Sequence, residues 1–167
     1  MLGAKLMQDL RSAGYPLATC ESDVECFAGK KTIEVFPHPA LVALLKRAYR
    51  VPYKVSKSSK YWKRTTVQER VVNLLVEFNE IERALRREFG RTHIDLPVSS
   101  AVTSLSRLKR YEDALDALSC AWVATRFIGG TAVAYGDDSA AIWVPHAYRR
   151  SNPGSSGRAE VRRSTSR

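Results

Sequence analysis

The most regular hydrophobic pattern in the chain covers residues 67–89. Apolar residues recur there every three or four positions, charged residues fill the other side, and Gly90 follows. This spacing predicts an amphipathic helix that ends at the glycine. A second helical pattern covers residues 111–128 and has apolar residues on more than one side, so we expect that helix to be buried deeply.

Shorter patterns predict the remaining elements. Residues 2–10 have apolar positions at helical spacing, and residues 31–36 (KTIEVF) alternate polar and apolar positions as a strand does. A helix over residues 40–47 is expected after the sequence Pro-His-Pro. Two short apolar segments, 131–135 and 140–144, flank the sequence GDDS and predict a β-hairpin.

Length and composition favour a single domain. The chain has 167 residues, of which 44% are hydrophobic, and this is enough to build a core and excludes global disorder. Residues 149–167 differ, with six arginines and one glutamate among Ser, Gly and Pro and almost nothing apolar. We therefore expect a folded domain over 1–148 and a disordered Arg/Ser-rich tail over 149–167.

The chain carries a large net positive charge. Lys and Arg total 27 against 17 Asp and Glu, for a net charge of +10, which favours an anionic partner. Nine of these cations lie within residues 46–70, with one glutamate and several aromatic residues. Such a segment can neutralise phosphates while its rings stack on bases, so it predicts contact with DNA or RNA, although solvated basic loops are also common. The candidate nucleic-acid-binding residues are Lys54, Lys57, Lys60, Trp62, Lys63 and Arg64. Residues 55–60 of this basic stretch are mostly polar, and we predict that they form a flexible loop.

Targeting features are not recognisable. The three cysteines, Cys20, Cys26 and Cys120, have neither the number nor the spacing of a disulfide framework or a zinc site. The first residues do not resemble a signal peptide, and charged residues interrupt the longest apolar stretch. We expect a cytoplasmic protein without a membrane partner.

Three acidic residues are candidates for chemistry. Asp113 and Asp116 lie three residues apart in the predicted helix, so their side chains share one face. Like charges at a partly buried position repel, and a hard divalent cation would relieve that repulsion. Glu34, near the end of the predicted strand, is the candidate third carboxylate. An interpretation without a metal is also open, in which Asp113 stabilises the first helical turn and the other two acids are solvated.

Four segments of the chain are distinctive when taken together: IEVFPHPAL at 33–41, YKVSKSSKY at 53–61, YEDALDALSCAWVA at 111–124 and YGDDSAAIWVP at 135–145. They resemble the domain of unknown function 429 family, whose members are described as predicted RNase-H-like nucleases. The resemblance covers about residues 30–146, and the last helix is also similar to the final catalytic helix of RuvC-type junction resolvases.

This resemblance implies an α/β domain of the ribonuclease H superfold that gathers acids around two Mg²⁺ (or Mn²⁺) ions. It implies that Glu34 is a ligand from a strand, that Asp116 is a ligand from the helix, and that Asp113 lies beside it. The implied reaction is attack of water on a phosphodiester bond of nucleic acid.

The sequence departs from the family pattern before Glu34. Members have leading strands with a Gly-x-Asp catalytic acid, whereas Asp9 falls in a predicted helix and Asp23 in an irregular stretch. We therefore expect the C-terminal portion of the fold, without its N-terminal strands, and a nuclease site weakened or inactivated by the missing aspartate. An uncovered sheet edge would then favour self-association. The alternative is a non-catalytic nucleic-acid-binding module; a third is an interaction domain whose charge only maintains solubility.

Overall fold

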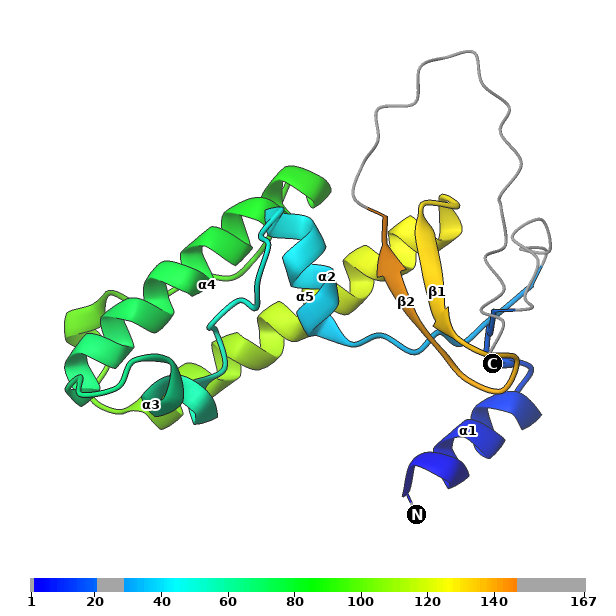
Figure 1. The fold of residues 1–167 in the computed structure, drawn as a ribbon, viewed down its shortest axis with the longest axis horizontal. Coiled ribbons are helices and arrows are strands. Elements are labelled where there is room, and N and C mark those ends of the chain that lie inside the picture. Colours follow the sequence, from blue (N-terminus) through cyan, green and yellow to red (C-terminus); the bar gives the residue numbers. More distant parts are fainter. Residues whose placement is uncertain (1, 21–28, 147–167) are drawn as a thin grey trace, which may run out of the picture.

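Two long helices form the frame of the computed structural model, which describes residues 2–20 and 29–146 (Figure 1). Helix α4 packs against α5, and the short helix α2 packs against both of them and against strand β2. The described elements are α1 Leu2–Ser12, α2 Pro37–Leu45, α3 Ser58–Tyr61, α4 Val67–Phe89, α5 Lys109–Ile128, β1 Ala132–Gly136 and β2 Ala141–Pro145. Three 3₁₀ turns connect them: η2 Val55–Lys57, η3 Ser99–Ala101 and η4 Leu105–Leu108.

Helix α4 confirms the prediction from its hydrophobic spacing. Thr66 and Glu69 form a capping box at its start, each side chain bonding the other residue's backbone N–H. Gly90 ends the helix with φ 74°, a backbone angle that residues with a Cβ rarely adopt. Most of the apolar stripe is buried, with Phe78 and Ile81 fully enclosed, whereas Val67 at the start of the helix is 49% exposed. Both ends and the buried face therefore follow from local sequence.

Helix α5 and the hairpin are joined through aromatic packing. The rings of Phe127 on α5 and Trp143 on β2 lie edge to face, with centroids 4.6 Å apart. The indole N–H of Trp143 donates to the backbone oxygen of Ala18 at 3.0 Å, which ties the N-terminal segment to the hairpin. Trp143 is thus the point where three parts of the chain meet.

The β-hairpin lies where the sequence predicts it. Its strands pair antiparallel, with Ala134 opposite Trp143 and Gly136 opposite Ala141. At Gly136 a Cβ would lie 2.1 Å from the backbone oxygen of Ala140, so only glycine fits. Asp137 accepts backbone hydrogen bonds from Ser139 and Ala140 and closes the turn.

The predicted strand over residues 31–36 is wrong in part. Its segment is extended but makes only isolated bridges, Leu17 with Thr32 and Glu34 with Ile142. Helix α2 begins directly afterwards at Pro37, earlier than the predicted start at residue 40. Proline suits the first turn of a helix because its fixed φ is helical and its missing N–H is not needed there.

The flexible loop predicted over residues 55–60 is also wrong. This stretch forms η2 and α3, and its side chains at Val55 and Ser58 are buried. Burial of these two side chains, three residues apart, fixes a backbone that the polar composition had suggested would be mobile.

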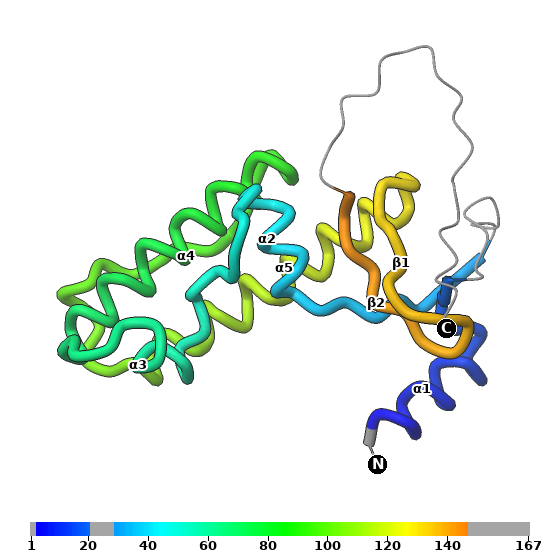
Figure 2. Tube along the Cα trace, in the orientation of Figure 1, coloured from blue at the N-terminus to red at the C-terminus, as the bar shows by residue number. Residues whose placement is uncertain are grey.

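The described residues form a mixed α/β arrangement with one two-stranded antiparallel sheet. Helix α1, which confirms the prediction for residues 2–10, lies near the hairpin turn, at the opposite end of the molecule from α3 (Figure 2). No described helix is long and apolar enough to cross a membrane. The predicted tail over 149–167, Asp23 and Cys26 lie outside the described residues.

Candidate functional site

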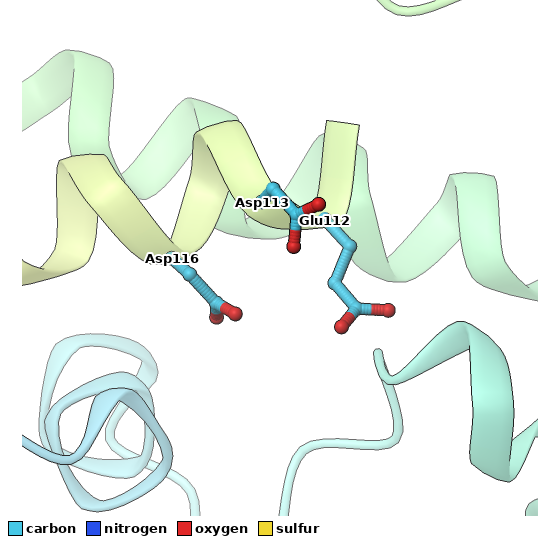
Figure 3. Close-up of side chains that lie close together, drawn as sticks. All are labelled: Glu112, Asp113 and Asp116. Atoms are coloured by element: carbon cyan, nitrogen blue, oxygen red, sulfur yellow. The ribbon is translucent and has the colours of Figure 1, made fainter. Parts of the chain in front are cut away.

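Three carboxylates gather on the first half of α5. Ligand oxygens of Glu112, Asp113 and Asp116 all lie within 4.8 Å of one another. Figure 3 shows the side chains projecting from two successive turns, with Glu112 and Asp116 extending toward the chain that faces the helix. Glu112 is buried, Asp116 is partly buried and Asp113 is exposed. We call these three residues the acidic cluster.

Two lysines neutralise part of this charge. Lys54 Nζ lies 2.5 Å from Asp116 Oδ2 and 3.3 Å from Glu112 Oε1. Lys109 Nζ lies 2.9 Å from Glu112 Oε1 and also pairs with Asp113, and these hydrogen bonds, Asp113 first, raise the pKa of Lys109. Three carboxylates thus face two ammonium groups, which leaves one negative charge at neutral pH.

Neutral donors complete the contacts of the two less exposed acids. The backbone N–H of Val55 donates to Glu112 Oε2 at 2.7 Å. The hydroxyl of Tyr53 donates to Asp116 Oδ1 at 2.7 Å. Burial, and then the hydrogen bond to Asp116, raise the pKa of Tyr53 far above its usual range, so its phenol stays protonated and a donor.

A second phenol, that of Tyr61, is left without a partner. The hydroxyl of Tyr61 is buried and makes no hydrogen bond within the described part of the chain. Buried hydroxyls nearly always bind something, so the Tyr61 hydroxyl marks a position for an oxygen atom of water or of a ligand.

His38 supports Tyr53 from the other side. Its ring lies 5.3 Å from the Tyr53 ring, and its Nε2 accepts a hydrogen bond from Arg50 Nε at 2.9 Å. Burial, followed by the charges of Arg50 and Lys54, lowers the pKa of His38. The imidazole is therefore neutral near pH 7 and acts as an acceptor, which holds Arg50 in place.

Glu34 is not brought into the acidic cluster. It pairs with Ile142 in an isolated bridge, and paired residues point to the same face of a sheet. Trp143, the next residue, points to the opposite face and packs on Phe127 of α5. The flanking residue Ile33 packs toward the core. The alternation thus directs the Glu34 carboxylate away from the helix that carries Asp113 and Asp116.

Comparison with known proteins gives one match. The model of the family described as "protein of unknown function (DUF429)" matches residues 3–140. The chain belongs to the DUF429 family. The match begins at residue 3, so it includes α1, which lies outside the region of about 30–146 where the sequence shows the resemblance. No curated protein and no solved structure matches.

The cations predicted to bind nucleic acid separate into two groups in this DUF429 chain. Lys54 pairs with Glu112 and Asp116 of the acidic cluster. The other four are exposed, and their side chains make no hydrogen bond or ion pair with any described residue; we call them the basic segment: Lys57, Lys60, Lys63 and Arg64. Trp62 is partly buried against the core, and its ring meets that of Tyr61 edge to face.

Cysteine chemistry is disfavoured at this site of the DUF429 chain. Cys120 lies one turn beyond Asp116 on α5. Burial, and then the charge of Asp116, raise the pKa of the Cys120 thiol. Only the thiolate is a strong nucleophile, so Cys120 is a packing residue here.

Sequence reasoning did not select Glu112, a member of the acidic cluster, or Lys109, which pairs with it. Glu112 lies four residues before Asp116, the spacing that puts two helical side chains on one face, and this signal was available. Its burial and its bond to Val55 depend on a contact between segments 57 residues apart, which no local pattern reveals.

Proposed function

We propose that this DUF429 chain binds nucleic acid and that its acidic cluster holds a divalent cation, Mg²⁺ or Mn²⁺, for phosphodiester hydrolysis. One observation carries the proposal: residues 53–64 serve both parts of the site. Tyr53 and Lys54 contact the cluster, and the basic segment extends from the same stretch into solvent. A phosphate held by the basic segment would lie beside the carboxylates.

The donor set fits a hard cation. The cluster offers only oxygen ligands, and they lie close enough to share one ion. The unpartnered Tyr61 hydroxyl is a further buried polar group on the stretch 53–64. Because Glu34 points away, the described residues support one ion rather than two. When bound, such an ion polarises a phosphoryl oxygen and lowers the pKa of attached water.

The protein's own residues have separate roles in this proposal. Glu112, Asp113 and Asp116 bind the cation, and Tyr53 fixes the orientation of Asp116 through its hydrogen bond. Lys54 and Lys109 balance the acids in the structure described here. With a cation held by the three acids, Lys54 would no longer be needed to balance their charge and would be available as a donor to a substrate phosphate.

Cleavage assays with paired variants test the nuclease proposal. Labelled single-stranded and duplex DNA and RNA are incubated with Mg²⁺ or Mn²⁺, and product is followed on denaturing gels. Asp116→Asn should abolish cleavage while binding persists, whereas Glu34→Gln, which removes one acid outside the cluster, should cleave normally. Loss of cleavage in Glu34→Gln with normal cleavage in Asp116→Asn overturns the assignment of the site.

A second candidate function is a non-catalytic nucleic-acid-binding module. The observation that favours it is that Lys54 and Lys109 already form ion pairs with the three carboxylates. These ion pairs give every acid of the cluster a partner without a metal. This alternative predicts salt-sensitive nucleic-acid binding, no cleavage with any divalent cation, and no rise of the melting temperature on adding Mg²⁺ or Mn²⁺. A metal-dependent rise that Asp116→Asn removes would reject it.

A further inference from the structure

A pocket of about 360 Å³ lies where residues 97–102 face the start of α5. One wall is apolar and is formed by Pro97, Ala101 and Val102. The other wall is polar and is formed by Ser106, Arg107, Arg110 and Tyr111. Pockets of this size, with an apolar surface and a few convergent polar groups, are typical of small-ligand sites.

The two arginines of this pocket have no acidic partner. Arg107 and Arg110 are exposed, and no carboxylate of the described residues forms an ion pair with either of them. Lys109, which lies between them in sequence, is directed to Glu112 and Asp113 instead. Two guanidinium groups are therefore available to an anion at this wall.

Arg110 is held in position within the pocket. Its Nη2 donates to the hydroxyl of Tyr111 at 2.6 Å, and its guanidinium carbon lies 4.7 Å from the centre of the Tyr111 ring. This stacking already restricts the Arg110 side chain, so less conformational entropy is lost when it binds a ligand. A smaller entropy loss favours a higher affinity. The remaining N–H groups of the guanidinium are free to donate.

The pocket is separate from the acidic cluster although both lie on the same stretch of helix. At 3.6 residues per turn, Arg110 falls on the side of α5 opposite Glu112 and Asp116 but only one turn from the exposed Asp113, and Arg107 lies in η4 before α5 begins. Asp116 and Glu112 are bonded instead to Tyr53 and Val55. None of the three acids lines the pocket, so a ligand there would meet the arginines first.

We propose that this pocket binds a phosphate monoester attached to a ring, as in a nucleoside monophosphate or the 5′-terminal nucleotide of a strand. Paired guanidinium groups match the geometry and the double charge of a phosphate monoester, whereas a carboxylate needs only one of them. The hydroxyl of Ser106, which shares a hydrogen bond of 2.9 Å with the hydroxyl of Ser104, adds a polar group, and the wall of Pro97 and Val102 takes the apolar part. This site goes beyond the proposed nuclease and does not depend on it.

Isothermal titration of the full chain tests this site, with AMP, inorganic phosphate and adenosine as probes. AMP should bind best and adenosine should not bind measurably. The double variant Arg107→Gln, Arg110→Gln should lose about tenfold or more in AMP affinity because charge-assisted hydrogen bonds are lost. The control Arg83→Gln, Arg87→Gln, on the exposed side of α4, carries the same loss of charge and should change affinity less than about twofold.

A second comparison separates the two sources of the phosphate. An oligonucleotide with a 5′-phosphate should bind more tightly than the same strand with a 5′-hydroxyl if the pocket takes strand ends, and this difference should vanish in the double arginine variant. Equal binding of both strands, together with arginine-dependent AMP binding, assigns the pocket to free nucleotides. Any of three results overturns the proposal. The control variant loses as much AMP affinity as the double arginine variant, AMP binds no more tightly than adenosine, or the folded protein does not bind AMP.

Discussion

Lys54 Nζ lies 2.5 Å from Asp116 Oδ2, an ion pair between residues 62 positions apart in the sequence. It joins the segment between α2 and α3 to α5 at the centre of the acidic cluster. The same ammonium competes with any cation for the carboxylates, because both stabilise the same negative charge. This ion pair therefore links the stability of the fold to the affinity of the cluster for metal.

Replacement of Lys54 should separate these two effects. Lys54→Met removes the charge but keeps much of the aliphatic length, and it should lower the free energy of unfolding by roughly 1–3 kcal/mol without metal. Divalent cations should then restore more stability than they give the parent protein. Urea denaturation with and without Mg²⁺ or Mn²⁺ measures both. Lys57→Met, at an exposed and unpaired position, is the control and should change neither the free energy of unfolding nor its increase with divalent cations. If the two variants give the same values, the ion pair of Lys54 does not link stability to metal affinity.

The two phenols near the cluster should respond differently to loss of their hydroxyls. Tyr53→Phe removes the donor to Asp116 and should cost about 1–2 kcal/mol of stability, because a partly buried carboxylate loses a partner. Tyr61→Phe removes a hydroxyl that has no partner among the described residues and should leave stability unchanged or raised. Thermal denaturation compares them. If the Tyr61 hydroxyl binds a ligand or its water, Tyr61→Phe should weaken divalent-cation binding in titrations.

The neutral state of His38 should make the fold less stable in mild acid. Burial, then Arg50 and Lys54, lower the pKa of His38 below its ordinary 6.5, so the unfolded chain takes up the proton first as pH falls. The free energy of unfolding should therefore decrease from about pH 7.5 to about pH 5.5. Protonation would also remove the acceptor for Arg50 Nε. Urea denaturation should show a smaller decrease for His38→Gln, and an unchanged decrease for the exposed control His93→Gln.

Local patterns predicted the elements whose signals lie within one segment. Helix α4 has its apolar stripe, its capping box at Thr66 and Glu69, and its terminal Gly90 in consecutive sequence. The hairpin likewise has Gly136 and Asp137 at its turn. The mixed α/β composition and the closeness of Asp113 to Asp116 followed from the same kind of information.

The relations that depend on distant contacts could not be predicted in this way. A shift of one residue in strand register moves each side chain to the other face of the sheet. The sequence does not determine this register, so it could not place Glu34 relative to Asp116. Lys54 belonged to a basic stretch in sequence, and only the fold shows that it pairs with acids while Lys57 does not. The basic stretch looks uniform in the sequence, but contacts with a distant segment of the chain make one of its lysines a member of an ion pair and leave the other unpaired.

The outer edge of β1 should allow self-association. Within the described residues β1 pairs only with β2, and Val133 and Tyr135 on its outer face are exposed. Unpaired backbone groups at such an edge can bind a second copy of the chain. Sedimentation should show association that increases with concentration and that Val133→Lys reduces, because a charge at the edge opposes pairing. Val76→Lys, on the exposed side of α4, should leave it unchanged; a monomer at all concentrations would contradict the prediction.

The basic segment should account for much of the salt dependence of nucleic-acid binding. Each phosphate contact releases about one counterion, so the logarithm of the affinity falls with the logarithm of salt in proportion to the number of contacts. The triple variant Lys57→Gln, Lys60→Gln, Lys63→Gln should reduce that slope by roughly 2–3. Fluorescence anisotropy with labelled single strands measures the slope.

The matched control for this measurement removes three other exposed arginines, with Arg83→Gln, Arg87→Gln and Arg91→Gln combined. It lowers the net charge by the same amount but leaves the cations near the acidic cluster in place. Its slope should stay within about one of the parent value, because only cations that contact phosphate release counterions. Equal slopes for the two triple variants would mean that the net charge of +10, and not the position of the basic segment, governs binding.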